Sequence, residues 1–265
     1  MALPNMFPNA GCSRLQEDLG DGFDVRSLGL TFHEGHVLGK HAHSWAQLVY
    51  AKTGLMHVEV RNRIYFVPPT KALWIPPKVT HRITFAGDVE MRTLYVSSQR
   101  ARLQRNGVVT LEVQPLLSHL IQYIQTIKML DPGLPEHDHL ASVLMDLIVG
   151  SPTLDLSLPL PLDDRAIRLA DLLRSNPCDK RRLSVLAALV GASLRTMQRH
   201  FVGETGLTLD VWRQKARLIH SVASLSAGAS VTTAAMECGY ESASAYIAAF
   251  KRQYGVTPGR FVAVA

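Results

Sequence analysis

The sequence is poor in cysteine and has no long apolar run. Its three cysteines, Cys12, Cys178 and Cys238, are too scattered for a disulfide framework or a metal-binding spacing. This pattern favours unpaired thiols in a reducing cytoplasm. Because no run of about 18 uninterrupted apolar residues occurs, we expect neither a membrane span nor a membrane partner. The N-terminus also lacks the basic start and apolar stretch of a secretion signal, so a cytoplasmic protein is expected.

Acidic residues are scarce in only one part of the chain. Residues 1–162 carry 14 Lys and Arg against 14 Asp and Glu, whereas residues 163–265 carry 14 against 8. The whole excess charge of +6 therefore lies after residue 162. This asymmetry favours a polyanion as the partner of that part, the alternative being a basic surface without a partner. An apolar fraction of 47% in 265 residues is enough for two globular domains.

Short apolar runs between Val25 and Val96 predict a small β-sandwich or barrel. Turn residues at Lys52-Thr53-Gly54 and Pro68-Pro69 are expected to separate the strands. From residue 111 the apolar period changes to three and four, which predicts two helices, within 116–130 and 139–149. The proline-containing segment 151–162 is expected to be an extended linker.

The residues after the linker are expected to be helical throughout. The predicted helices are Asp164–Ser175, Ser184–Val190, Ser193–Val202, Leu209–Leu225, Val231–Glu237 and Ser242–Gln253. Their expected N-caps include Ser184, Ser193, Ser230 and Ser242.

One short construction occurs twice in this helical part. AALVG at 187–191 precedes Ser193, and AMECG at 235–239 precedes Ser242. In each copy a short helix ends near a glycine, the chain turns, and a serine caps a second helix, which is the pattern of a helix-turn-helix. The second helix of such a unit enters the DNA major groove with its N-terminal residues. The alternative is repeated helical packing without any DNA contact.

The residues expected at DNA lie on the second helix of each unit. Arg reads guanine and Gln reads adenine, whereas small residues permit close approach and cations near the helix end suit phosphate. Leu194, Met197 and Phe201 are expected to face the core instead. The predicted DNA-binding residues are Ser193, Arg195, Thr196, Gln198, Arg199, Ser242, Ser244, Ala245, Tyr246, Lys251 and Arg252.

The helix predicted at Leu209–Leu225 is about 25 Å long, at about 1.5 Å per residue, and the width of the flanking helix-turn-helix units adds to the distance that it spans. Successive major-groove faces lie about 34 Å apart, so one chain could read two of them on the same side of double-stranded DNA. Residues 163–265 resemble the DNA-binding domain of the AraC/XylS family of bacterial transcription regulators. ETGLTLDVWRQKARL at 204–218 and ECGYESASAYIAAFKRQYGVTPGRF at 237–261 carry the resemblance.

A histidine-rich box occupies residues 35–54, GHVLGKHAHSWAQLVYAKTG, and PPKVTH ends at His81. Strand alternation puts His41 and His43 on one face, where a third imidazole could complete a divalent metal site. The spacing resembles the cupin superfamily, with Gln47 in place of the usual Glu, Lys78 of the usual Gly and Phe85 of the usual Asn. The candidate ligands are His41, His43, Gln47 and His81; the alternative is a set of pocket-lining or hydrogen-bonded remnants.

The first domain thus resembles the cupin-type sensor of AraC-family regulators. Trp45, Tyr50 and Trp74 are candidate pocket residues for an unidentified small-molecule effector, with core packing as the alternative. The helical segment occupies the place where such regulators commonly form homodimers. Its apolar stripe suits a dimer contact or packing on its own barrel, and it comprises Leu116, Leu117, Leu120, Ile124, Ile127 and Leu130.

We therefore expect an α+β chain with a cupin-like β-barrel and two helices, followed by an all-α domain with two helix-turn-helix units joined by a long helix. The expected parts are a sensor at 1–106, a helical segment at 107–150, the linker at 151–162 and the DNA-binding domain at 163–265. The predicted function is a transcriptional activator that responds to a small molecule or metal and contacts RNA polymerase. The alternatives are a cupin-type metal-dependent enzyme and an architectural DNA-binding protein.

Overall fold

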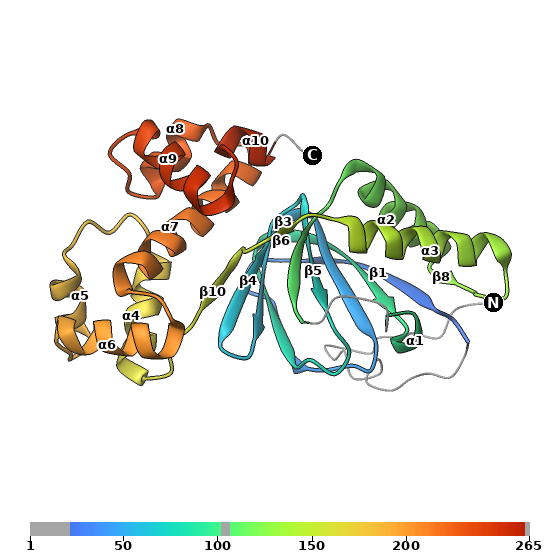
Figure 1. The fold of residues 1–265 in the computed structure, drawn as a ribbon, viewed down its shortest axis with the longest axis horizontal. Coiled ribbons are helices and arrows are strands. Elements are labelled where there is room, and N and C mark those ends of the chain that lie inside the picture. Colours follow the sequence, from blue (N-terminus) through green and yellow to red (C-terminus); the bar gives the residue numbers. More distant parts are fainter. Residues whose placement is uncertain (1–21, 102–106, 263–265) are drawn as a thin grey trace. The chain divides into compact units, whose positions relative to one another are not determined.

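The structure, a computed structural model, describes residues 22–101 and 107–262, so Cys12 lies outside the described residues (Figure 1). The chain divides into two compact units, the first rich in β-structure and the second helical. The second unit begins at Leu156 and also includes Asn62–Ile64. The expected α+β chain of two domains is confirmed. Among the described helices, none combines the length and the apolar character needed to cross a membrane.

The first unit is built on antiparallel pairing around the long strands β3 and β6. The strand order is β8-β1-β6-β3-β5-β7-β9, with β2 also paired to β6, and β4 paired to β3 and β10. The strands are β1 (Val25–Phe32), β2 (Val37–His41), β3 (Ala46–Val60), β4 (Arg63–Val67), β5 (Lys71–Ile75), β6 (His81–Val96), β7 (Val109–Glu112), β8 (Met129–Leu130) and β9 (Thr153–Leu154), together with β10 (Ser157–Pro159), whose residues belong to the second unit.

The central strands are buried on both faces, which explains why they read as continuous apolar runs. In β3, Leu48 joins the cluster beneath the helices, whereas its neighbour Val49 joins the cluster on the opposite face of the sheet. Leu73 and Trp74 of β5 divide in the same way. This division follows from the alternation of side chains along a strand. The barrel therefore has two apolar layers, one inside it and one under its covering helices.

The predicted turn at Lys52-Thr53-Gly54 is wrong, because these residues lie within β3. The pairing of β3 with β6 shifts register between Ala51 and Thr53 and again between Thr53 and Leu55. Gly54 has a φ of +79°, a conformation that glycine adopts without a steric penalty. The glycine thus marks an irregularity inside one long strand, as isolated strand glycines often do. A turn between β4 and β5 is present as expected, at Pro69-Thr70, one residue later than the predicted Pro68-Pro69.

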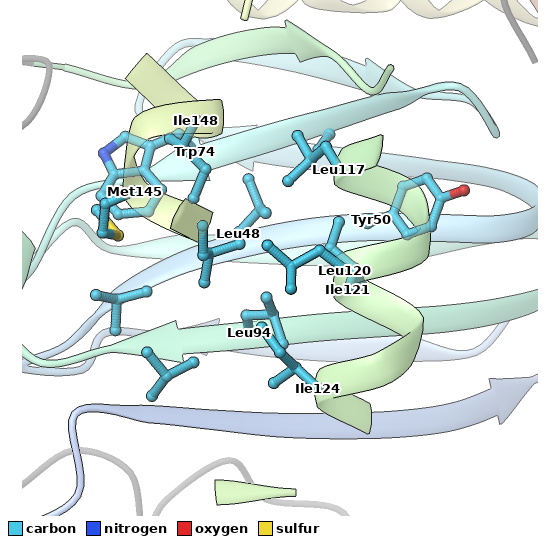
Figure 2. Close-up of a cluster of buried hydrophobic side chains, with 14 of the residues drawn as sticks. Leu48, Tyr50, Trp74, Leu94, Leu117, Leu120, Ile121, Ile124, Met145 and Ile148 are labelled. Carbon is cyan, nitrogen blue, oxygen red and sulfur yellow. The ribbon is translucent and has the colours of Figure 1, made fainter. Parts of the chain in front are cut away.

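Helices α2 (Pro115–Ile127) and α3 (Pro135–Gly150) lie side by side on the sheet, and α1 (Ser98–Ala101) is a single turn (Figure 1). Four residues of the predicted dimer stripe are buried in the cluster between these helices and the sheet: Leu117, Leu120, Ile124 and Leu130. Figure 2 shows the α2 side chains among this group pointing towards Leu48 and Leu94 of the strands. The stripe therefore packs on its own barrel, and only Leu116 of the six is exposed.

The second unit contains seven helices among its described residues. They are α4 (Asp164–Ser175), α5 (Leu183–Leu189), α6 (Leu194–Thr205), α7 (Leu209–Ser226), α8 (Val231–Glu237), α9 (Ala243–Tyr254) and α10 (Pro258–Val262). The six expected helices are present, and α10 was not predicted. Ser193, Ser230 and Ser242 cap α6, α8 and α9 as expected. Ser184 was wrongly expected to cap α5, which begins one residue earlier after Arg182.

The segment 151–162 is less uniform than the predicted linker, because it contains β9 and β10. Within the second unit, its later part is held by two hydrogen bonds. The indole Nε1 of Trp212 donates to the carbonyl oxygen of Pro159 at 2.6 Å, and the Leu160 amide donates to the carbonyl oxygen of Asn62 at 2.8 Å. Burial of the Trp212 ring, 0% exposed, makes the indole bond a fixed attachment of this segment to α7.

Candidate functional site

The first helix-turn-helix consists of α5, a four-residue connection at 190–193 that includes Gly191, and α6. Gly191 adopts the predicted positive φ, at +72°. The Ala192 amide donates to the carbonyl oxygen of Ala187 at 3.1 Å and closes the turn. Ser193 Oγ then accepts from the Thr196 amide at 3.1 Å, which satisfies one of the free amides at the start of α6. The turn and the cap together set the direction in which α6 leaves α5.

Helix α6 has one buried face and one exposed face. Met197 and Phe201 are fully buried, and the Phe201 ring lies edge-on to Trp212 of α7 with the centroids 5.3 Å apart. On the other face Arg195, Gln198 and Arg199 are exposed. Ser193 is also exposed, and Thr196 is half-buried. The side chains expected at DNA are therefore accessible on the helix that the fold presents.

The second helix-turn-helix repeats this geometry in α8 and α9. Gly239 has a φ of +74°, and the Tyr240 amide donates to the carbonyl oxygen of Ala235 at 3.0 Å. Ser242 Oγ accepts from the Ala245 amide at 3.2 Å. The matching bonds confirm that the two sequence copies form the same local structure, with one extra residue in the second turn.

One residue of the second helix-turn-helix that was expected to contact the DNA major groove is part of the core instead. Tyr246 is 0% exposed, its hydroxyl donates to Ser221 Oγ of α7 at 2.9 Å, and its ring lies edge-on to Phe250. Tyr246 is thus the counterpart of Met197, one turn into its helix, and not a reading residue. The remaining expected residues of α9 are all exposed: Ser242, Ser244, Ala245, Lys251 and Arg252.

Both helix-turn-helix units are fastened to α7. Arg217 Nε of α7 donates to the carbonyl oxygen of Pro177 at 2.8 Å, and its Nη2 donates to that of Asp179 at 3.0 Å. The loop that receives these bonds also contacts the second helix-turn-helix, because Cys178 Sγ lies against the carbonyl oxygen of Glu237 in α8. A Cβ on Gly239 would come within 3.3 Å of the Cys178 backbone. The sequence offered no signal that the loop at 177–179 would contact both α7 and the second helix-turn-helix.

The first unit contains the predicted histidine cluster. His41, His43 and His81 each place one potential ligand atom within 4.8 Å of the other two. Each ring Nδ1 lies within hydrogen-bond distance of a backbone carbonyl oxygen two residues away: Gly39 at 2.8 Å, Trp45 at 2.6 Å and Val79 at 2.9 Å. A carbonyl oxygen can only accept, so Nδ1 carries the proton and Nε2 keeps its electron pair in a neutral ring. Metal-binding histidines are commonly oriented in this way.

Gln47 faces His43 with an oxygen, not with its amino group. Thr93 gives its hydroxyl proton to the carbonyl oxygen of Leu48, so its oxygen accepts from Gln47 Nε2 at 3.0 Å. Gln47 Nε2 also donates to the Tyr95 hydroxyl at 3.1 Å. The amide oxygen is therefore left 3.1 Å from His43 Nε2. Two electron-pair donors at this separation repel each other unless a proton or a cation lies between them.

Burial of the histidines disfavours a proton between the Gln47 oxygen and His43 Nε2. Removal from water lowers the pKa of His43, and it lowers the pKa of His81 to about 3, so both rings are neutral at neutral pH. The Nε2 atoms of His41 and His81 are buried and have no hydrogen-bond partner among the described residues. Three imidazole nitrogens and one amide oxygen form a donor set that a divalent cation such as Zn²⁺ accepts. The residues therefore fit a metal ion.

The three aromatic residues expected in an effector pocket lie in apolar clusters. Trp74 and Tyr50 are 1% and 6% exposed and pack in the cluster beneath α2 and α3 (Figure 2). Trp45, 2% exposed, packs against Tyr95, with the Arg26 guanidinium 5.2 Å above its ring. The alternative of core packing is thus what the structure contains for all three rings, although Trp45 packs on the same Tyr95 ring that His43 contacts.

The residues that orient Gln47 were missed at the level of sequence. Thr93 and Tyr95 lie on β6, and Gln47 is paired directly with Tyr95 across the β3–β6 ladder. Their period-two spacing on a predicted strand was a usable signal that both side chains face the histidines. The strand register, which the sequence does not contain, was needed to identify their partner.

Comparison with known proteins covers both units. A family model described as an AraC-like ligand binding domain matches residues 27–151, and one described as a helix-turn-helix domain matches residues 186–263. The HTH-type transcriptional regulator NimR of Escherichia coli (strain K12) is 30% identical over 223 residues, which cover 84% of this chain and 81% of NimR.

Two further relatives are more distant or match a shorter segment. The HTH-type transcriptional activator RhaR of Salmonella schwarzengrund is 22% identical, with 85% of this chain and 87% of RhaR covered. The HTH-type transcriptional regulator RipA of Corynebacterium glutamicum is 35% identical over 39% of this chain and 31% of RipA. These relatives are regulators and not enzymes, which removes the alternative of a cupin-type enzyme. The chain belongs to the AraC family of transcriptional regulators, with a ligand-binding domain followed by a helix-turn-helix domain that binds DNA.

Proposed function

We propose that this regulator inserts the starts of α6 and α9 into two successive major-groove segments of one duplex. The observation that carries the proposal is the repeated helix-turn-helix on one shared helix, with exposed polar residues at the start of each second helix. The confinement of the excess positive charge to residues 163–265 supports the same surface. Arg195 and Gln198 are the base-reading residues, and Lys251 and Arg252 contact phosphate.

The Arg195→Ala variant tests this assignment. Loss of a guanine contact is expected to weaken specific binding by about 1–3 kcal/mol and to relax preference at one base pair. Binding would be measured against a library of duplexes at fixed salt. Arg174→Ala, at the end of α4 and outside both helix-turn-helix units, is the matched control and should keep the preference. An unchanged preference in Arg195→Ala would place the reading face elsewhere.

We further propose that the first unit responds to a small-molecule effector or a metal ion and alters how the DNA-binding domains are presented. The name of RhaR as an activator favours activation, which requires contact with RNA polymerase. We also propose a cytoplasmic homodimer. Its contact would use the outward face of α2, where Leu116 and Tyr123 are 62% and 54% exposed, since the stripe first expected there is buried. The functional boundaries we propose are a sensor at 1–106, a helical segment at 107–150, a linker at 151–162 and a DNA-binding domain at 163–265.

The metal ligands we propose are His41, His43, His81 and Gln47. Purified protein exposed to Zn²⁺ should bind about one equivalent, and His43→Ala should lose it because a tetrahedral site needs its full donor set. His33→Ala is the matched control, since His33 is exposed and contacts Asp88 away from the cluster. Elemental analysis after dialysis is the measurement. Equal metal content in the two variants would contradict the assignment.

A further inference from the structure

A cavity of about 290 Å³ lies beside the histidine cluster in the first unit. Its lining combines the end of β2, the end of β3 with the following turn, and the segment that leads into β6. The lining residues are Lys40, Glu59, Arg61, Lys78, Val79, Thr80 and His81. The volume is near the lower limit of small-molecule sites, about 300 Å³. We call this cavity the cationic pocket.

The charges of the cationic pocket do not cancel. Lys40, Arg61 and Lys78 contribute three positive groups, and Glu59 contributes one negative group. The Glu59 carboxylate also lies 3.9 Å from the Arg82 guanidinium, which offsets part of its charge. A concave surface with an excess of one sign concentrates small ions of the opposite sign. The pocket is therefore suited to an anion of limited size.

Two of the three cations stand where the backbone disfavours a side chain. Arg61 has a φ of +53° and Lys78 a φ of +64°, in the left-handed region that glycine occupies more readily. The Lys78 amide donates to the carbonyl oxygen of His43 at 2.7 Å, which ties this turn to the histidine cluster. Long cationic side chains are thus present at two positions where local geometry alone favours glycine. Unfavourable backbone of this kind is concentrated at functional sites.

His81 connects the cationic pocket with the metal site. It lines the cavity, it is 1% exposed, and its Nε2 has no hydrogen-bond partner in the described part of the chain. We propose that the cationic pocket binds a small-molecule effector through an oxyanion, a carboxylate or a phosphate, with Lys40, Arg61 and Lys78 as its counter-charges. This inference rests on the proposed role of the first unit as a sensor and identifies the chemical class of its effector.

The test uses the full chain and calorimetric titration with malonate and with inorganic phosphate. Malonamide, which has the shape of malonate without its charge, is the neutral probe. We expect at least one of the two anions to bind and malonamide not to bind. The double variant Arg61→Gly/Lys78→Gly removes two counter-charges while easing both backbone conformations, so binding should weaken at least tenfold without loss of thermal stability. Lys52→Met removes an exposed charge outside the pocket and should bind as the unchanged chain does.

Three results would overturn the inference. The first is malonamide binding as well as malonate, or neither anion binding. The second is equal anion affinity in the double variant and the unchanged chain. The third is a loss of DNA affinity in the double variant without any anion present, which would make the cations a DNA contact. Failure of the DNA-reading proposal would appear in the Arg195→Ala experiment, and failure of the metal proposal in the His43→Ala experiment. The anion titration stays interpretable in both cases, because Lys40, Arg61 and Lys78 are neither proposed DNA contacts nor proposed metal ligands.

Discussion

At Gly54, β3 passes close to the backbone of the neighbouring strand β6. A Cβ built at this position would overlap the carbonyl oxygen of Asp88 and lie 2.8 Å from Val89 Cγ2. Since Asp88 contributes backbone and not a movable side chain, the strand cannot relax around an added atom. The positive φ and the close approach together explain why this position holds glycine in the middle of a strand.

Gly54→Ala should therefore lower the free energy of unfolding of the first unit by about 3 kcal/mol or more, as the sum of a left-handed backbone penalty and a steric overlap. Gly87→Ala is the matched control, because Gly87 has a φ of +82° but nothing within 4 Å of its Cβ position. Its cost should be only about 1–2 kcal/mol. Denaturant titration followed by tryptophan fluorescence measures both. Equal losses would show that the overlap at Gly54 is relieved.

At the scale of the element, helix ends in the second unit depend on serine caps. Ser230 Oγ accepts from the Thr233 amide at 3.1 Å at the start of α8. Ser184 lies inside α5 and caps nothing. We expect Ser230→Ala to cost about 1 kcal/mol and Ser184→Ala to cost close to nothing, since alanine is the better residue inside a helix. Thermal unfolding of the two variants compares them, and an equal loss would contradict the assignment of the caps.

The pair Ser184 and Ser230 also illustrates what the sequence can predict about elements. Apolar periodicity placed the helices, because the period of a helix is a property of neighbouring residues. It did not say which of two serines begins the helix, since that depends on where the preceding chain turns. The same limit applies to α2, whose apolar stripe was identified correctly, while the sequence did not decide between a dimer partner and its own barrel as the covering surface. Strands such as β8, two residues long, exist only through a partner distant in sequence.

The site residues that follow from local spacing were also predictable, and those that depend on the tertiary fold were not. The helical spacing of Arg195 and Gln198 correctly predicted an exposed face, because Met197 and Phe201 marked the buried one. In α9 small residues surround Tyr246, and the sequence pattern did not distinguish the buried face from the exposed one. The histidines came together as predicted, but not by alternation along one strand, because His41 ends β2 and His43 lies in the connection to β3. The cationic pocket was not predictable, because Lys40, Arg61 and Lys78 are brought together only by the closure of the barrel.

At the scale of the whole molecule, the separation of charge between the two parts should control DNA binding. Displacement of counterions by several cationic side chains makes the logarithm of affinity fall linearly with the logarithm of salt concentration. We expect a steep negative slope for the full chain and a slope smaller by about 0.9 for Lys251→Ala, which removes one phosphate contact. Arg195→Ala should change base preference more than slope. Electrophoretic mobility or anisotropy measurements between low and moderate salt provide the data, and a slope near zero would refute phosphate contact.

The contact of Cys178 with the turn around Gly239 has a consequence for the operator. Because the loop at 177–179 contacts both α7 and the second helix-turn-helix, we expect the two helix-turn-helix units to keep a fixed relative geometry when they bind DNA as proposed. One base pair inserted between the two halves rotates them by about 34° relative to each other, since B-DNA has about 10.5 base pairs per turn. If the chain reads DNA as proposed, a fixed geometry would not accommodate such a rotation, and we expect the operator to preserve the length of its spacer as strictly as the bases on either side of it.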